Sequence, residues 1–190
     1  MLSAAIQDYL KEIYKLQSEG TRPTTTAEHS PYHGVVLSED GTKIALEVIR
    51  HHRLLEQYLA ETLGVPIDAV HAEADRLEHV LSEELEARID EQLGYPTHDP
   101  HGDPIPDAGL RVETRRLRSL DALEPGEEAT VRRVPDTDSE LLRYLAGLRL
   151  VPGGRVTMRR SEPFDGPLTV AVDGQEHAIS RDLAMQIGIA

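Results

Sequence analysis

The stretch that decides the fold runs Val70-His-Ala-Glu-Ala-Asp-Arg-Leu-Glu-His-Val-Leu-Ser82. Its potential ligands are four, three and one residues apart, so they share one broad face of a predicted helix: His71, Asp75, Glu78 and His79. Carboxylate and imidazole side chains gathered on one face can bind a divalent metal ion. The alternative is a solvated acidic face, which composition alone favours.

Two other predicted helices carry similar pairs. His52 and Glu56 lie four residues apart on one helix, and Asp8 and Glu12 lie four apart on the first helix. One such pair is usually a surface ion pair, but three sets on neighbouring helices favour a metal site inside a helical bundle. Oxygen and imidazole ligands suit Mn²⁺ or Fe²⁺ in octahedral geometry, and we expect Zn²⁺, Co²⁺ or Cd²⁺ to substitute in vitro.

Charge is concentrated in the same region. The chain has 190 residues and a formal net charge of −14. Residues 51–108 hold 14 acidic and three basic side chains, together with six of the nine histidines. The absence of cysteine excludes disulfides and thiolate metal ligands, which fits a cytoplasmic protein. The net charge first argues against nucleic acid as a partner, but its location fits cation binding better.

Hydrophobic periodicity and Gly/Pro punctuation predict the elements. A connector is predicted over 20–31, a hairpin limb with a turn over 32–41, a loop over 94–109 and a basic linker over 111–118. Helices are predicted over 3–17, 42–63, 66–93 and 139–146, and strands over 129–134, 155–160, 168–172 and 176–179. Short strands separated by Gly/Pro turns across about 70 residues predict a small barrel at the C-terminus.

Several segments together resemble the diphtheria toxin repressor (DtxR/MntR) family of bacterial iron- or manganese-dependent transcriptional repressors: Asp8–Tyr14, Ile49–Leu59, Val70–Ser82, Pro100–Pro106 and Leu150–Val156. The resemblance implies a multidomain α+β protein. Its parts would be an incomplete winged helix-turn-helix DNA-binding domain (1–45), a helical dimerisation and metal-binding domain (46–110), a linker (111–119) and an SH3-like barrel of the FeoA type (120–190).

The same resemblance implies the roles of individual residues. It places Asp8, Asp75, Glu78 and His79 in a primary metal site, with His52 at or beside it, and His52, Glu56 and His71 in an ancillary site to which the barrel could add Asp138. Some members use the following loop instead, which makes Asp99 and His101 secondary candidates, and this loop is more often a plain turn. The DNA-binding residues would be Thr24, Thr25, Thr26, Tyr32 and His33. Iron-selective members carry sulfur ligands at the positions of Asp8 and Asp75, so oxygen at both argues for manganese.

The DNA-reading part is too short in this sequence. Thr24–Ala27 resembles the start of the positioning helix, and Glu28–Gly34 already resembles the approach to the wing. The family pattern places roughly two dozen residues, including the recognition helix, between Ala27 and Glu28. Three explanations are open: the printed sequence omits the segment, the segment was deleted by design, or a natural variant no longer reads DNA. We favour the first two, because the flanking remnants would otherwise have no purpose.

The predicted function is a metal-activated repressor, acting as a cytoplasmic homodimer on double-stranded operator DNA, with neither a membrane nor a small-molecule substrate as partner. Without metal, repulsion among the clustered carboxylates should loosen the first helix. The alternative is a metal-binding dimeric member of the family that has lost DNA binding through the deletion. A metal-dependent hydrolase is a third hypothesis, but we find no separate nucleophile, phosphate loop or oxyanion motif and predict no enzyme.

Overall fold

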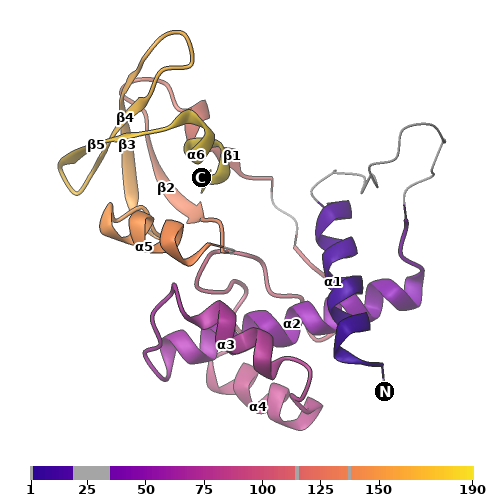
Figure 1. Cartoon of the computed structure of the whole chain (residues 1–190). Helices are drawn as coiled ribbons and strands as arrows, with labels where there is room; N and C mark the ends of the chain where they lie inside the picture. Colours follow the sequence, from indigo (N-terminus) through magenta and orange to yellow (C-terminus); the bar gives the residue numbers. More distant parts are fainter. Residues whose placement is uncertain (1, 19–34, 114–115, 137) are drawn as a thin grey trace, which may run out of the picture.

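The computed structural model describes residues 2–18, 35–113, 116–136 and 138–190, which form a helical N-terminal part and a sheet-based C-terminal part (Figure 1). The helices of the N-terminal part are α1 (Ala4–Ser18), α2 (Glu39–Glu61), α3 (Val70–Leu77) and α4 (Glu83–Gln92). α2 is the central element, because α1, α3 and α4 all pack against it. Its side chains Leu54 and Leu55 form a small buried core with Ala74, Ile89 and Ile105.

The start of α2 corrects the hairpin predicted over 32–41. Residues 32–34 lie outside the described part of the chain, and residues 35–37 form no strand. Ser38 instead caps α2, since its hydroxyl accepts a hydrogen bond from the Gly41 backbone amide at 3.1 Å. Glu39 and Asp40 follow in the first turn, where negative charge stabilises a helix N-terminus. The Ser-Glu-Asp-Gly sequence is therefore a helix start rather than a β-turn.

The single long helix predicted over 66–93 is also wrong. The chain leaves the helical path after Leu77 and begins α4 after Ser82, whose hydroxyl accepts a hydrogen bond from the Leu85 amide at 3.3 Å. Three glutamates in the first turn of α4 reinforce this second start. The break places Glu78 and His79 in a turn between two helices, which changes the direction in which they can point.

The C-terminal part is a six-stranded antiparallel sheet in the order β1-β6-β2-β3-β4-β5. The strands are β1 (Arg118–Ser119), β2 (Glu128–Arg133), β3 (Arg155–Ser161), β4 (Leu168–Val172), β5 (Gln175–Ile179) and β6 (Gly188–Ile189). Short helical segments η1 (Leu120–Ala122), α5 (Ser139–Gly147) and α6 (Arg181–Gln186) accompany them. Their buried apolar side chains form one core, which includes Leu145, Met158 and Ile187.

This sheet confirms the predicted SH3-like, FeoA-type C-terminal domain, and four of its strands lie within one residue of their predicted bounds. α6 and the two-residue strands β1 and β6 were not predicted, because such short elements carry no periodicity. The boundary between the predicted DNA-binding domain (1–45) and dimerisation domain (46–110) stays a prediction. α2 runs through that position without interruption. No helix in the described ranges is both long and apolar enough to cross a membrane.

One close contact joins the two parts. The loop after α4 approaches β2, where the Val134 amide donates a hydrogen bond to the His101 carbonyl at 2.9 Å. Gly102 has a φ of +92°, and a Cβ added there would lie 1.8 Å from the Arg132 carbonyl oxygen. Only glycine fits both the backbone conformation and the space. An ion pair of 2.9 Å between Arg143 of α5 and Asp68, which precedes α3, adds a second link.

Candidate metal centre

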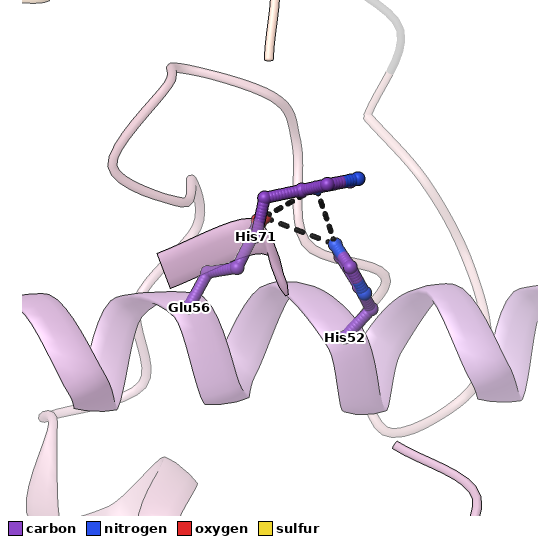
Figure 2. Close-up of side chains that lie close together, drawn as sticks. All are labelled: His52, Glu56 and His71. Atoms are coloured by element: carbon purple, nitrogen blue, oxygen red, sulfur yellow. Dashed lines mark hydrogen bonds and ion pairs between the residues drawn. The ribbon is translucent and has the colours of Figure 1, made fainter. Parts of the chain in front are cut away.

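The first cluster of potential ligands joins α2 to α3 (Figure 2). His52 and Glu56 project from one face of α2, four residues apart, and His71 points towards them from α3. The Glu56 Oε1 atom lies 3.0 Å from both His52 Nε2 and His71 Nδ1, and these two nitrogens are 3.1 Å apart. Two imidazoles and a carboxylate therefore converge, as the sequence predicts for the ancillary site.

The second cluster joins α1 to the turn between α3 and α4. His79 Nε2 lies 2.9 Å from Asp8 Oδ1 and 3.4 Å from Glu78 Oε1. The other ring nitrogen of His79 lies 2.7 Å from the Gln7 side-chain oxygen. Gln7 can accept the Nδ1 proton, which leaves Nε2 free to bind a metal, as outer-shell partners of metal-bound histidines do.

His52 connects these two clusters. Its Nδ1 contacts Glu78 Oε2 at 2.5 Å and Asp75 Oδ1 at 3.4 Å, while its Nε2 faces Glu56. Burial opposes the charged imidazole, but hydrogen bonds to Glu56 and Glu78 outweigh it and raise the pKa of His52 to about 9. Burial likewise opposes ionisation of Glu78, and its contacts with His52 and Lys11 still lower its pKa. We call the group Asp8, His52, Asp75, Glu78 and His79 the primary centre.

Lys11 was not among the predicted site residues, yet its ammonium group lies inside the primary centre. Its Nζ is 2.7 Å from Glu78 Oε1 and 3.2 Å from Asp75 Oδ1. The expected loosening of α1 assumed uncompensated repulsion among the carboxylates. The structure instead places a positive charge between them, carried by α1 itself. The sequence could have indicated this position of Lys11, because it follows Asp8 by three residues and residues three apart share a helix face.

A further cluster lies deeper, where α2 meets the loop after α4. Glu56, Asp99 and His101 are buried and hold ligand atoms within 4.8 Å of one another. One polar atom of each has no hydrogen-bond partner: Glu56 Oε2, Asp99 Oδ2 and His101 Nδ1. Buried polar atoms without hydrogen-bond partners are costly, and a bound ion would satisfy them. We call this group the second centre.

The ionisable groups of the second centre strongly perturb one another, and a cation would have to replace their protons. Burial, with Glu56 and Asp103 nearby, raises the pKa of Asp99 to about 8. Burial opposes the charged form of His101, but its contact with Glu56 raises the pKa to about 9. His101 Nε2 lies 3.0 Å from the Ile67 carbonyl, which can accept its proton and direct Nδ1 towards the orphaned oxygens. The residues present therefore fit a divalent cation.

The remaining predicted residues are Asp138, which lies away from these centres, and the DNA-binding candidates. Asp138 caps α5, where its Oδ1 accepts hydrogen bonds from the amides of Glu140 and Leu141 at 2.8 and 3.2 Å. It belongs to none of the ligand clusters found among the described residues, and its metal role stays a prediction. The predicted DNA-binding residues Thr24, Thr25, Thr26, Tyr32 and His33 lie outside the described residues.

A buried ion network, also missed by sequence reasoning, holds α4 against α2 beside the primary centre. The Arg50 side chain donates to Asp90 at 2.6 Å and contacts Glu86 at 2.5 Å, and His51 Nε2 lies 2.8 Å from the other Glu86 oxygen. His51 Nδ1 lies 3.1 Å from the Glu78 carbonyl. This network fixes the backbone that carries Glu78, so it positions a primary-centre ligand without needing a metal itself.

We expect Glu86→Gln to lower the free energy of unfolding by about 1.5–3 kcal/mol, the usual worth of hydrogen bonds to charged groups. Burial opposes ionisation of Glu86, but hydrogen bonds from His51 and Arg50 hold its pKa below the ordinary 4.5, so this stabilisation is lost as pH falls through the folded-state pKa. Burial opposes the charged form of His51, but its contacts with Glu86 and the Glu78 carbonyl outweigh burial and raise its pKa above 6.5. The stability that His51 contributes is therefore complete below pH 6.5 and is lost as pH rises through the raised folded-state pKa.

The loss in Glu86→Gln should therefore be largest between pH 4.5 and 6.5. Urea unfolding in EDTA at several pH values measures it. The matched control is Glu84→Gln, on the same helix, whose partner is the exposed Arg88 at 2.9 Å. Equal, pH-independent losses in both variants would contradict the role given to the network.

Known proteins resemble both parts of this chain. A family model described as the iron-dependent repressor metal binding and dimerisation domain matches residues 38–107, and a FeoA domain model matches residues 118–190. The iron-dependent repressor IdeR of Mycobacterium tuberculosis is 31% identical over 207 positions, with 89% of each chain covered. The diphtheria toxin repressor of Corynebacterium efficiens is 30% identical over 217 positions, covering 95% of this chain and 93% of that protein.

A solved structure of a manganese-dependent transcriptional repressor in complex with manganese superposes with a TM-score of 0.82 at 33% identity, covering 97% of this chain and 99% of that chain. Fold, site and relatives together define a metal-dependent transcriptional regulator. The chain belongs to the iron-dependent repressor family, which includes the diphtheria toxin repressor.

The comparison also bears on the short DNA-reading part. The alignment with IdeR has 207 positions, whereas 89% of this 190-residue chain is about 169 residues. Roughly 38 positions of the alignment therefore have no residue from this chain. This number exceeds the roughly two dozen residues that the family resemblance places between Ala27 and Glu28, and the missing recognition helix stays a prediction.

Proposed function

We propose that this chain senses Mn²⁺, or Fe²⁺ as the second choice, through the primary centre. The observation that carries the proposal is the meeting of Asp8 from α1 with Glu78 and His79 from the turn between α3 and α4. The centre offers carboxylate oxygens and imidazole nitrogens and no sulfur, a set that suits Mn²⁺ and Fe²⁺. Zn²⁺, Co²⁺ and Cd²⁺ are expected to bind in vitro.

When bound, the metal supplies two positive charges that several carboxylates can share. The chain supplies the coupling, because Asp8 belongs to α1 while Glu78 belongs to the helical core. Binding therefore favours the arrangement in which α1 lies against α2 and α3, and shifts the population towards it. Gln7 keeps the His79 ring oriented, and the Arg50–Glu86 network holds the backbone of Glu78 in place.

We further propose that a second cation binds at Glu56, Asp99 and His101, with His71 and His52 beside it. The three unpartnered buried atoms support this site. Because Glu56 Oε1 faces His52 and His71 while its Oε2 faces His101, this one carboxylate borders both the ancillary cluster and the second centre. The sequence-based prediction preferred the ancillary cluster with Asp138, whereas the buried donor atoms of Asp99 and His101 support a role for the loop.

The partners we propose are a second copy of this chain and double-stranded operator DNA, and the proposed location is the cytoplasm. Exposed apolar side chains gather at the turn between α3 and α4, at Leu77, Val80 and Leu85. Exposed apolar patches of this kind commonly mark protein interfaces. The family model that matches residues 38–107 describes a dimerisation domain, which supports a second copy of this chain as a partner. We propose a regulatory role and no catalytic one.

We expect Asp8→Asn to weaken Mn²⁺ binding by at least about tenfold, as loss of a metal-site partner does. Calorimetric titration measures the dissociation constant, and amide hydrogen exchange measures protection of α1 with and without Mn²⁺. The matched control is Glu12→Gln, also on α1, whose carboxylate lies 3.7 Å from Lys15. Unchanged Mn²⁺ affinity in Asp8→Asn would refute the primary centre as assigned.

The rival function, a metal-binding dimer that has lost DNA binding, rests on the missing segment. A mobility-shift assay with Mn²⁺ and a palindromic promoter fragment separates the two functions, provided that the protein is first weighed by intact mass. A mass equal to the 21.1 kDa of this sequence, with no Mn²⁺-dependent shift, supports the rival. A larger mass and a shift abolished by EDTA support the repressor.

A further inference from the structure

Lys11 holds an unusual position for a lysine. Its side chain is buried, with 7% of its surface exposed, and its ammonium binds two proposed metal ligands at once. Burying an ammonium group is costly unless carboxylates pair with it. The pairing is good here, because Glu78 is fully buried and presents Oε1 at 2.7 Å. Lys11 is thus held by the same charges that would attract a divalent cation.

The contact is with the atom that a metal would need. Glu78 Oε1 is the oxygen that faces His79 Nε2 in the cluster with Asp8. Its other oxygen, Oε2, is directed at His52. Lys11 also binds Asp75 Oδ1, the atom of that carboxylate nearest to His52. A divalent ion bound among these side chains must therefore either share Glu78 Oε1 with the ammonium or displace the ammonium from it.

We propose that Lys11 is an internal competitor of the divalent ion at the primary centre. It holds α1 on Glu78 when no metal is bound, and it yields Glu78 Oε1 when the metal enters, so it lowers metal affinity and raises the concentration at which the sensor responds. This inference rests on the proposed function of the primary centre. Lys11 is a positioning and affinity-determining residue, and it does not bind the metal.

The charges favour competition over a purely structural role. The centre contains three carboxylates, from Asp8, Asp75 and Glu78. The Lys11 ammonium lies 2.7 Å from Glu78 Oε1 and 3.2 Å from Asp75 Oδ1, so it repels a divalent ion that approaches the same oxygens. Removing the ammonium charge therefore makes the centre more attractive to a divalent ion. A lysine that only anchored α1 would give the opposite result, because its loss would separate Asp8 from the other ligands.

The test compares Lys11→Met and Lys11→Gln with wild type by calorimetric titration with Mn²⁺. We expect about a tenfold decrease in the Mn²⁺ dissociation constant, equivalent to about 1.4 kcal/mol, because the ion no longer competes with the ammonium for Glu78 Oε1. Lys11→Gln retains a donor for Glu78 and guards against loss of folding in the methionine variant. The matched control is Lys15→Met, one turn further along α1, whose partner Glu12 lies outside the centre.

Hydrogen exchange of α1 without metal supplies an independent readout, and we expect faster exchange in Lys11→Met that Mn²⁺ reverses. Unchanged or weaker Mn²⁺ binding in both variants overturns the proposal. Failure of the proposed function would look different: wild type and Glu78→Gln would then bind Mn²⁺ equally. If they differ while the Lys11 variants match wild type, only the competitor role of Lys11 fails.

Discussion

Glu78→Gln should weaken Mn²⁺ binding at the primary centre by at least about a hundredfold, since even outer-shell partners of metals are worth roughly 10–100-fold. Glu78 is the side chain common to both ligand groups of this centre, facing Asp8 and His79 with one oxygen and His52 with the other. Glutamine preserves the size of the side chain but removes its charge. Calorimetry, with elemental analysis of the dialysed protein, gives affinity and stoichiometry together.

The stoichiometry separates the two centres. We expect Glu78→Gln to lose one ion per subunit and to retain the ion held by Glu56, Asp99 and His101. Glu73→Gln is the matched control, because Glu73 lies on α3 but pairs with the exposed Arg76 at 2.7 Å. Loss of all bound metal in Glu78→Gln would show that the two centres do not bind independently. Retention of full Mn²⁺ affinity would remove Glu78 from the ligand set.

Gly102→Ala should be strongly destabilising, because the new Cβ would lie 1.8 Å from the Arg132 carbonyl oxygen. We expect a loss of about 3 kcal/mol or more, combining the left-handed backbone penalty of roughly 1–2 kcal/mol with an overpacking cost of about 1–3 kcal/mol. The loop must also move away from β2, which displaces Asp99 and His101. Chemical unfolding measures the first effect, and Mn²⁺ stoichiometry measures the second.

Gly126→Ala is the matched control for this variant. Gly126 has nearly the same φ, +94°, but nothing lies within 4 Å of its added Cβ. It should show the backbone penalty without the clash and without any change at the second centre. Equal losses of stability in the two variants would mean that the contact between the loop and β2 contributes nothing beyond backbone strain.

The sequence predicted part of the candidate site because helical spacing is a local property. His52 and Glu56 could be placed on one helix face from their numbers alone, whereas Glu78 and His79 were expected on the helix of Asp75 and lie in the turn after it. The break after Leu77 escaped prediction, since the apolar pattern continues through Val80 and Leu81 and only the capping hydroxyl of Ser82 marks the new start. Lys11 escaped because a lysine on an amphipathic helix ordinarily faces solvent.

The second centre shows a different limit of sequence analysis. Asp99 and His101 lie more than forty residues from Glu56, in a loop without periodicity, so no spacing rule can bring them together. Their position follows from tertiary packing, through Gly102 against β2 and the Ile67 carbonyl against His101. Family resemblance made these two residues alternatives to Asp138, and the sequence-based prediction preferred Asp138.

The continuity of α2 has a mechanical consequence. The helix carries His52 near its middle and begins at Glu39, thirteen residues earlier, directly after the segment that the family uses to read DNA. At 1.5 Å per residue, these positions are about 20 Å apart on one rigid rod. A tilt of about 5° around His52 would therefore swing the start of the rod by roughly 1.7 Å. A small movement at the metal centre can thus become a larger displacement at the start of α2. A displacement of this size could decide whether a neighbouring helix fits the groove of the proposed operator DNA.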